Sequence, residues 1–187
     1  ELVHTMSEII SSVSDQPDAV TDAREILAYL LDVPRSWAAS HSNDTVSRDI
    51  SRRALAAAEK RAHGAPIQYC TGIAAFRNLT LQVDNRVLIP RPETELLVDH
   101  VLSRVKSGIA MDICTGSGAV AIALATEGNF DRVIATDISS DALQVAESNA
   151  QRYSSSRTAA LPGSCRGWSA GSFRSSHSPA SRACSRC

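Results

Sequence analysis

The sequence contains no hydrophobic run long enough to cross a membrane, since a spanning helix needs about 18–20 apolar residues and no stretch of the chain reaches that length. It also lacks the pattern of a secretory signal, in which a charged start is followed by an apolar segment and a small-residue cleavage site. Its five cysteines are too few and too scattered for a disulfide framework. We therefore expect a cytoplasmic protein with no membrane partner.

Acidic residues are absent from the last part of the chain. All 20 lie at or before Glu147, so residues 1–153, with 14 Lys and Arg, carry a net charge of −6. Residues 154–187 carry five Arg, no acid and many Ser, for a net charge of +5. The overall charge of −1 predicts no attraction to nucleic acid, and five charges spread over the tail are a weak signal for RNA. We expect this Ser/Arg-rich tail to be disordered, with no helix or strand.

Helical periodicity dominates the first third of the sequence. Residues 1–17 predict a short helix at best, ending near Pro17, whereas apolar residues at helical spacing predict helices over 18–32 and 47–63. Asp22, with Glu25 three residues later, is a candidate for a capped start. We assign residues 1–72 to a helical domain that packs against or recognises a substrate and has no chemistry of its own.

The period changes after this domain. Alternating residues from Phe76 to Val83 predict a strand, and a turn at Asp84-Asn85 leads to a second short strand at 87–89. We assign residues 73–108 to a hairpin and a linking helix. Residues 109–153 then alternate strand, helix, strand, helix, which indicates an α/β fold with a parallel sheet. The elements expected after the hairpin are a helix over 94–106, a strand over 109–113, a helix over 119–126, a strand over 132–138 and a helix over 140–152.

A glycine-containing loop follows the strand 109–113. Gly116 and Gly118 allow a tight turn and a close approach of the backbone to a ligand, and the next helix points its free N–H groups at that ligand. Asp137, 19 residues after Gly118, ends the next strand, where a carboxylate can accept both hydroxyls of a ribose. This spacing predicts binding of a nucleoside-type cofactor. It leaves open whether that cofactor is a dinucleotide, because Gly116-x-Gly118-x-x-Ala121 also fits the relaxed dinucleotide fingerprint.

Two further strings in the sequence are not explained by periodicity. Residues 64–72 read GAPIQYCTG and residues 89–95 read IPRPETE. They resemble the G-x-P-x-Q-Y-x-x-G and I-P-R-P-[DE]-T-E strings of the release factor glutamine methyltransferases (the HemK/PrmC family). The segment 112–118 is similar to that family's S-adenosylmethionine (SAM) loop, and the order of the motifs agrees. The resemblance covers residues 18–152.

The resemblance implies a fold, an activity, a cofactor and a partner. The fold is α/β: an N-terminal helical domain plus the first half of a SAM-dependent methyltransferase Rossmann-like domain. The family transfers a methyl group from SAM to the glutamine amide in the Gly-Gly-Gln loop of peptide chain release factors. Residues 109–153 would be a partial SAM-binding domain, and residues 1–72 would help to dock the release factor.

Site residues follow from the same resemblance. The residues implied to bind SAM are Asp112, Cys114, Thr115, Gly116, Ser117, Gly118 and Asp137. The residues implied to close over the cofactor pocket are Arg91, Glu93, Thr94 and Glu95. A purely structural reading of the second segment stays open, in which two prolines fix the chain direction and Thr94 caps the next helix.

The sequence departs from the family pattern at two places. Cys114 stands where the family has the first glycine of its loop, and a positive φ there would cost a cysteine about 1 kcal/mol or more. The Asn-Pro-Pro-Tyr string that holds the glutamine amide in the family is missing, so we assign no catalytic residue and expect no methyl transfer by this chain. We hypothesise a shift of reading frame near Ser154. Cys184-x-x-Cys187 has no paired partner set, so we expect no metal site.

Three functions remain open on the sequence alone. The first is a release factor glutamine methyltransferase lineage, the second a nicotinamide-dependent oxidoreductase using the same loop, and the third a non-catalytic fragment that docks on the release factor. We also expect poor solubility, because the strand 109–113 would keep one neighbour and expose its other edge.

Overall fold

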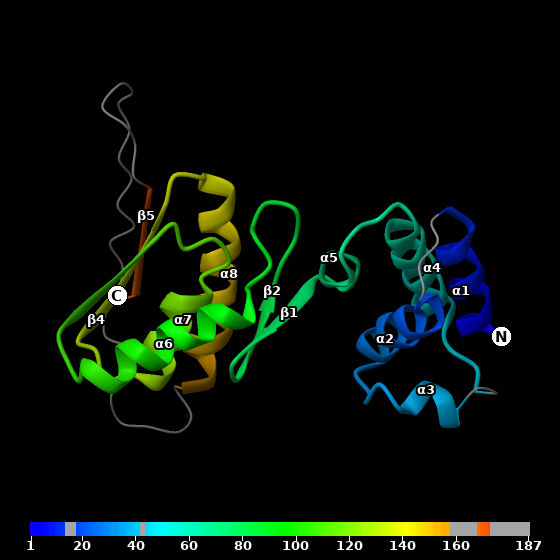
Figure 1. Ribbon diagram of the computed structural model, residues 1–187, viewed down its shortest axis with the longest axis horizontal. Helices are drawn as coiled ribbons and strands as arrows, with labels where there is room; N and C mark the ends of the chain where they lie inside the picture. Colours follow the sequence, from blue (N-terminus) through cyan, green and yellow to red (C-terminus); the bar gives the residue numbers. More distant parts are fainter. Residues whose placement is uncertain (14–17, 42–43, 158–167, 173–187) are drawn as a thin grey trace. The chain divides into compact units, whose positions relative to one another are not determined.

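The computed structural model divides the chain into two compact units, Glu1–Gly72 and Ile73–Cys187. It describes residues 1–13, 18–41, 44–157 and 168–172, which Figure 1 draws in colour. Most of the tail for which we expect disorder lies outside these residues. Within the described part, no helix is long and apolar enough to span a membrane, and no group of three or more His, Cys, Asp or Glu side chains is placed to hold a metal.

The described residues of the first unit form helices and the loops between them, with no strand (Figure 1). Its elements are α1 Leu2–Val13, α2 Ala19–Leu31, α3 Trp37–Ser40, α4 Arg48–Ala62 and α5 Ile67–Thr71. Met6 and Ile10, four residues apart on α1, are fully buried against α2 and α4. The short helix expected within residues 1–17 is therefore present as α1, and the neighbouring helices stabilise it by burying its apolar face.

Polar contacts define how the helices of this unit begin. Ser47 caps α4 by accepting a hydrogen bond from the N–H of Ile50 at 3.3 Å. The expected cap at Asp22 is wrong, because α2 begins at Ala19. The Asp22 carboxylate instead accepts a 2.6 Å hydrogen bond from Nε of Arg61 on α4, and both side chains are largely buried. This ion pair joins the two longest helices of the unit.

The second unit combines a hairpin, three helices and a parallel sheet. Its elements are β1 Ile73–Phe76, β2 Leu79–Gln82, α6 Pro92–Arg104, β3 Ile109–Ile113, α7 Ala119–Glu127, β4 Arg132–Asp137, α8 Ser140–Arg157 and β5 Trp168–Ser172. β1 and β2 pair antiparallel, whereas β3, β4 and β5 form a parallel sheet in that order. The α/β class expected from the sequence is confirmed.

The hairpin lies earlier in the chain than expected. Its turn falls at Arg77 and Asn78 rather than at Asp84, and residues 87–89 form no strand. The outer edge of β2 is not open to a further strand, because Tyr153 and Asn149 of α8 bond to the backbone of Thr80 and Gln82 there. Arg77 adopts a φ of 52° in this turn.

The guanidinium of Arg77 joins the hairpin to two helices. It donates to Asp99 on α6 at 2.7 Å and to Glu127 on α7 at 2.8 and 2.9 Å. These bonds raise the pKa of Arg77, so its charge is permanent. The hairpin is thereby fixed to the helical layer of the unit.

Two helix boundaries and one segment also differ from expectation. α6 begins at Pro92 with Arg91 at the cap position, so the proposed cap at Thr94 is wrong, and Thr94 lies in the first turn. A proline at the start of a helix has no N–H to leave unpaired, which favours this earlier start. α8 extends past Arg152 to Arg157, and β5 lies within residues 154–187, for which we predicted no helix or strand.

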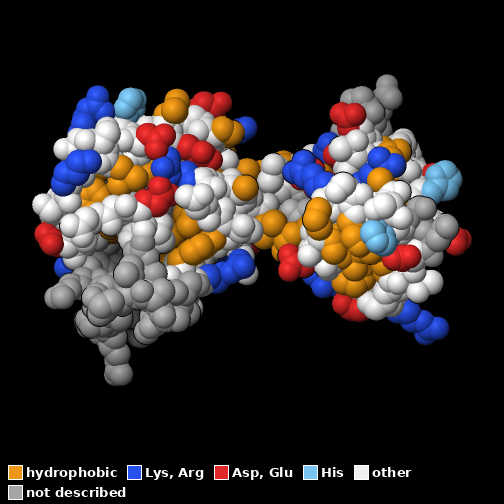
Figure 2. All heavy atoms as spheres, turned by 90° about the horizontal axis from the view of Figure 1, so that it is seen from below, with side chains coloured by type: hydrophobic (Ala, Val, Ile, Leu, Met, Phe, Trp, Pro, Cys, Tyr) orange, Lys and Arg blue, Asp and Glu red, His pale blue; other side chains and the backbone are white. Residues whose placement is uncertain are grey.

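One face of the parallel sheet packs against helices α7 and α8, and the other face of β3 is exposed. Ile109, Met111 and Ile113 alternate along that face with 69%, 58% and 70% of their surface exposed. Among the described strands, β3 also has a neighbour on one side only. In Figure 2, hydrophobic side chains are seen to reach the surface of this unit. The open edge of β3 expected from the sequence is therefore present among the described strands, whereas its exposed face was not expected.

Candidate functional site

The loop after β3 reverses direction through three residues with positive φ. Cys114, Gly116 and Gly118 have φ values of 64°, 55° and 83°. The N–H of Thr115 donates to the carbonyl of Thr136 on β4 at 2.9 Å, and the N–H of Gly118 donates to the carbonyl of Thr115 at 2.9 Å. These bonds hold the loop at the carboxyl end of two adjacent parallel strands, which is where ligands bind in open α/β sheets.

The two glycines of this loop have different structural roles. A Cβ atom on Gly118 would lie 3.1 to 3.3 Å from Ile122 and Ala146, so this glycine lets α7 and α8 pack closely. A Cβ on Gly116 would meet nothing within 4 Å, so this glycine is needed for its φ and faces open space. The loop thus has one packed side and one side that a ligand can approach.

Asp112 anchors the loop from inside. Its Oδ2 accepts hydrogen bonds from Oγ1 of Thr115 at 2.6 Å and from the N–H of Ala121 at 3.2 Å. Burial raises the pKa of Asp112 above its ordinary value, and the two hydrogen bonds oppose that rise. Because both bonds to its Oδ2 come from within the protein, Asp112 holds the loop to the start of α7.

Asp137 lies beside the loop at the end of β4. Its Oδ2 accepts a hydrogen bond from the N–H of Gly116 at 2.9 Å, and its Oδ1 accepts one from the N–H of Ser139 at 3.0 Å. Each carboxylate oxygen can accept a further hydrogen bond, and the residue is partly exposed. The structure therefore brings together Asp137 and the whole predicted loop, from Asp112 to Gly118.

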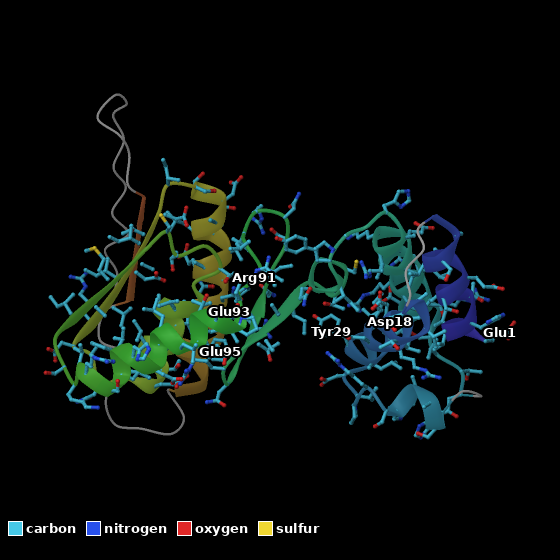
Figure 3. The ribbon with its side chains drawn as sticks, in the orientation of Figure 1. Glu1, Asp18, Tyr29, Arg91, Glu93 and Glu95 are labelled. Carbon is cyan, nitrogen blue, oxygen red and sulfur yellow. The ribbon has the colours of Figure 1, made fainter. Side chains whose placement is uncertain are left out.

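The IPRPETE segment forms the start of α6 (Figure 3). Arg91 and Glu93 are exposed there, and Thr94 is half-buried. Glu95 turns toward the hairpin, where its Oε1 accepts the N–H of Arg77 at 2.9 Å and its carbonyl accepts Nη1 of Arg77 at 3.1 Å. The contacts of Glu95 thus join the segment to the hairpin turn.

Comparison with known proteins adds independent information. Residues 4–72 match the model of the PrmC N-terminal domain, and residues 107–177 match that of RNA cap guanine-N2 methyltransferases. The release factor glutamine methyltransferase of Xylella fastidiosa strain 9a5c is 37% identical over 135 residues, covering 71% of this chain and 49% of the relative. That of Neisseria gonorrhoeae is 39% identical over 130 residues, covering 69% of this chain and 48% of the relative. That of Chlorobaculum tepidum is 45% identical over 106 residues, covering 52% of this chain and 36% of the relative.

The chain belongs to the release factor glutamine methyltransferase family. The resemblance stated from its motifs is confirmed. The chain spans about half the length of the curated relatives it matches. The two matched regions correspond to the helical unit and to the glycine loop with its sheet.

Two residues of this methyltransferase-family chain were missed by sequence reasoning. Ile138, directly after Asp137, is 80% exposed and offers an apolar surface beside the carboxylate. Its signal in the sequence is an apolar residue directly after Asp137, the last paired position of β4. Asn149 on α8 is completely buried and bonds to the loop through the carbonyl of Ser117 at 2.9 Å. A single Asn within a helix carries no motif that would have marked it.

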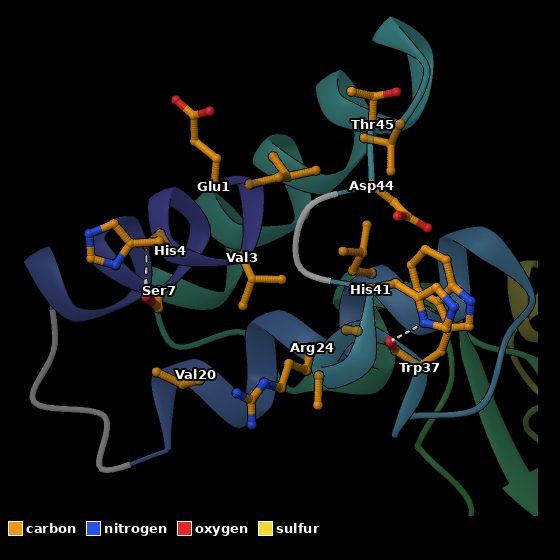
Figure 4. Close-up of a pocket in the computed structure, with 15 residues that line it drawn as sticks. Glu1, Val3, His4, Ser7, Val20, Arg24, Trp37, His41, Asp44 and Thr45 are labelled. Atoms are coloured by element: carbon orange, nitrogen blue, oxygen red, sulfur yellow. Dashed lines mark hydrogen bonds between the residues drawn. The ribbon is translucent and has the colours of Figure 1, made fainter.

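The helical unit of the methyltransferase-family chain contains a cavity of about 520 Å³ (Figure 4). Residues of α1, α2 and α3 line it, and the rings of Trp37 and His41 stack there with centroids 4.3 Å apart. The labelled side chains include His4 and Asp44, and Nδ1 of the lining residue His41 lies 3.0 Å from Oγ of Ser40.

Proposed function

We propose that this chain is the SAM-binding half of a release factor glutamine methyltransferase. The observation that carries the proposal is the Asp137 carboxylate, bonded to Gly116 and set beside the open side of the glycine loop. In this position it is suited to accept the two ribose hydroxyls of SAM. A sulfonium nucleoside is positively charged, and the carboxylates of Asp112 and Asp137 in the same loop region favour such a ligand.

The residues present fit the groups of SAM. Gly116 leaves room for the ligand, and the backbone N–H groups at the N-terminus of α7, a helix of nine residues, would suit its methionine carboxylate. The exposed side chain of Ile138 would suit the apolar face of the adenine. Bound SAM supplies an electrophilic methyl group, and the chain orients it. Cys114, Thr115, Ser117 and Gly118 complete the loop, and the pocket-closing role is proposed for the exposed Arg91 and Glu93, with Thr94 and Glu95 fixing the segment that carries them.

Methyl transfer to the release factor requires groups that hold the glutamine amide in line with the methyl group. The family resemblance assigns that task to Asn-Pro-Pro-Tyr, and the 187 residues contain no such string. We therefore propose that this chain binds SAM and, through its helical unit, a release factor, without completing the transfer itself.

The SAM site is tested by isothermal titration of the chain with SAM. Asp137→Asn should weaken binding about 10- to 100-fold, because hydrogen bonds to a charged group contribute about 1.5–3 kcal/mol. Asp131→Asn is the matched control, since Asp131 is exposed and directly precedes the same strand at its other end. Its affinity should stay within about twofold of the starting chain. Tighter binding of NAD than of SAM would favour the oxidoreductase alternative.

The substrate is tested by incubating the chain with a release factor and SAM labelled in its methyl group. We expect capture of the release factor by the immobilised chain and no label on the glutamine of its Gly-Gly-Gln loop. Label on that glutamine would show that the groups needed for transfer are present. Failure to capture the release factor would remove the docking role of the helical unit.

A further inference from the structure

Asn149 is a buried amide that contacts two parts of the α/β unit at once. It lies on α8 with none of its surface exposed. Its Nδ2 donates to the carbonyl of Gln82 and to the carbonyl of Ser117, each at 2.9 Å, and its Oδ1 accepts the N–H of Gln82 at 2.7 Å. Both amide hydrogens are used, and the two carbonyl partners and one N–H partner fix which end of the amide is nitrogen.

A tyrosine one helical turn later makes the matching contact on the same strand. The hydroxyl of Tyr153 donates to the carbonyl of Thr80 at 3.0 Å and accepts the N–H of the same residue. Four residues of helix rise about 6.0 Å and two residues of strand about 6.6 Å, so an i, i+4 pair on a helix can meet an i, i+2 pair on a strand edge. α8 thus closes the outer edge of β2 with two side chains.

Only one of these side chains also reaches the glycine loop. The carbonyl of Ser117 points at Asn149, and Ser117 is itself buried. Gln82, the other partner, ends β2 and lies a few residues before the IPRPETE segment. One amide therefore fixes the loop relative to the strand that leads into the segment assigned to close the cofactor pocket.

We propose that Asn149 is a positioning residue that holds the loop from Cys114 to Gly118 in its ligand-binding geometry. Its benefit for SAM rests on the proposed function, whereas its effect on the loop can be measured without a ligand. Losing both donors leaves the buried carbonyl of Ser117 without its side-chain partner, which frees the loop to move. Tyr153 shares the strand contact and lacks the loop contact, so it separates general stability from positioning.

The test compares Asn149→Asp with Tyr153→Phe in the full chain. Asn149→Asp keeps the side-chain shape and the acceptor for Gln82 but removes both donors. Tyr153→Phe removes the hydroxyl that bonds to Thr80. Hydrogen exchange of the amides of Thr115, Gly116 and Gly118 should become about tenfold faster in Asn149→Asp, corresponding to about 1.4 kcal/mol. In Tyr153→Phe it should change by less than about twofold after correction for global stability.

SAM titration gives the second readout. The dissociation constant should rise about tenfold in Asn149→Asp and stay within about twofold in Tyr153→Phe. Equal exchange rates of the loop amides in the two variants would overturn the proposal. If the starting chain binds no SAM, the proposed function fails, and the exchange experiment still decides the role of Asn149.

A measurement on the unaltered chain covers the case in which Asn149→Asp does not fold. The N–H of Gln82 donates to Asn149, and the amide of Gly118 lies in the loop that Asn149 holds. If one side chain couples them, both amides exchange through the same opening and respond equally to low concentrations of denaturant. Exchange through separate openings with different denaturant dependence would contradict the coupling.

Discussion

Replacing Cys114 with glycine should stabilise the protein, because the cysteine is held in a left-handed backbone conformation. Its φ is 64°, a region that costs an L-residue about 1–2 kcal/mol relative to its favoured conformations. Its side chain is exposed, so its removal loses no buried surface. Glycine also lowers the free energy of unfolding by about 0.5–1 kcal/mol, because the unfolded chain gains conformational entropy. The net gain expected is about 0.5–1 kcal/mol.

Thermal unfolding followed by circular dichroism measures this gain. For a chain of this size, about 1 kcal/mol raises the melting temperature by about 2–4 °C. Cys114→Ala is the control, because alanine removes the thiol but keeps the Cβ and the strain. Equal stabilisation by alanine and glycine would refute the argument from φ and would assign the effect to the thiol. Since Cys114 lies in the proposed SAM loop, the glycine variant should also bind SAM at least as tightly as the starting chain.

Three further predictions concern the α/β unit. Arg77→Met should cost about 2–3 kcal/mol in urea unfolding, because it breaks partly buried bonds to two helices. Arg86→Met, in an exposed pair, should cost clearly less, and equal costs of the two substitutions would contradict the network. Burial raises the pKa of Asp112 in the folded chain. The free energy of unfolding relative to Asp112→Asn should therefore be greatest below the unfolded pKa of about 3.9 and fall as pH rises through the folded pKa. If this difference in unfolding free energy instead grows with pH, the pKa is shifted the other way. Met111→Lys should reduce binding of a hydrophobic dye and slow aggregation with little change in melting temperature, and unchanged dye binding would show that the exposed face of β3 is not the binding surface.

Strands β3 and β4 and the glycine loop between β3 and α7 were predictable from the sequence because their signals are local. An apolar strand, two glycines and a carboxylate at the end of the next strand place Asp137 beside Gly116 by the geometry of parallel sheets alone. The loop and Asp137 were therefore identified as neighbours before the structure. At Cys114 the sequence raised a positive φ only as a condition, because the family has glycine there, and the structure has a φ of 64° at this position.

The contacts missed by sequence reasoning depend on tertiary packing. The hairpin was placed too late because alanines in β1 carry a weak strand signal, and because the sequence does not show that α8 occupies the outer edge of β2. Asn149 and Arg77 bond to residues 67 and 50 positions away, and no periodicity reports a contact of that separation. β5 was missed because its residues, Trp168 to Ser172, lie in a segment rich in serine and glycine.

The bare face of β3 makes this chain a candidate for chaperone binding. Incompletely packed chains with exposed apolar surface and unpaired strand edges aggregate readily, and chaperones bind such surfaces. Ile109, Met111 and Ile113 present a surface of this kind beside an open strand edge, so we expect a chaperone to bind there.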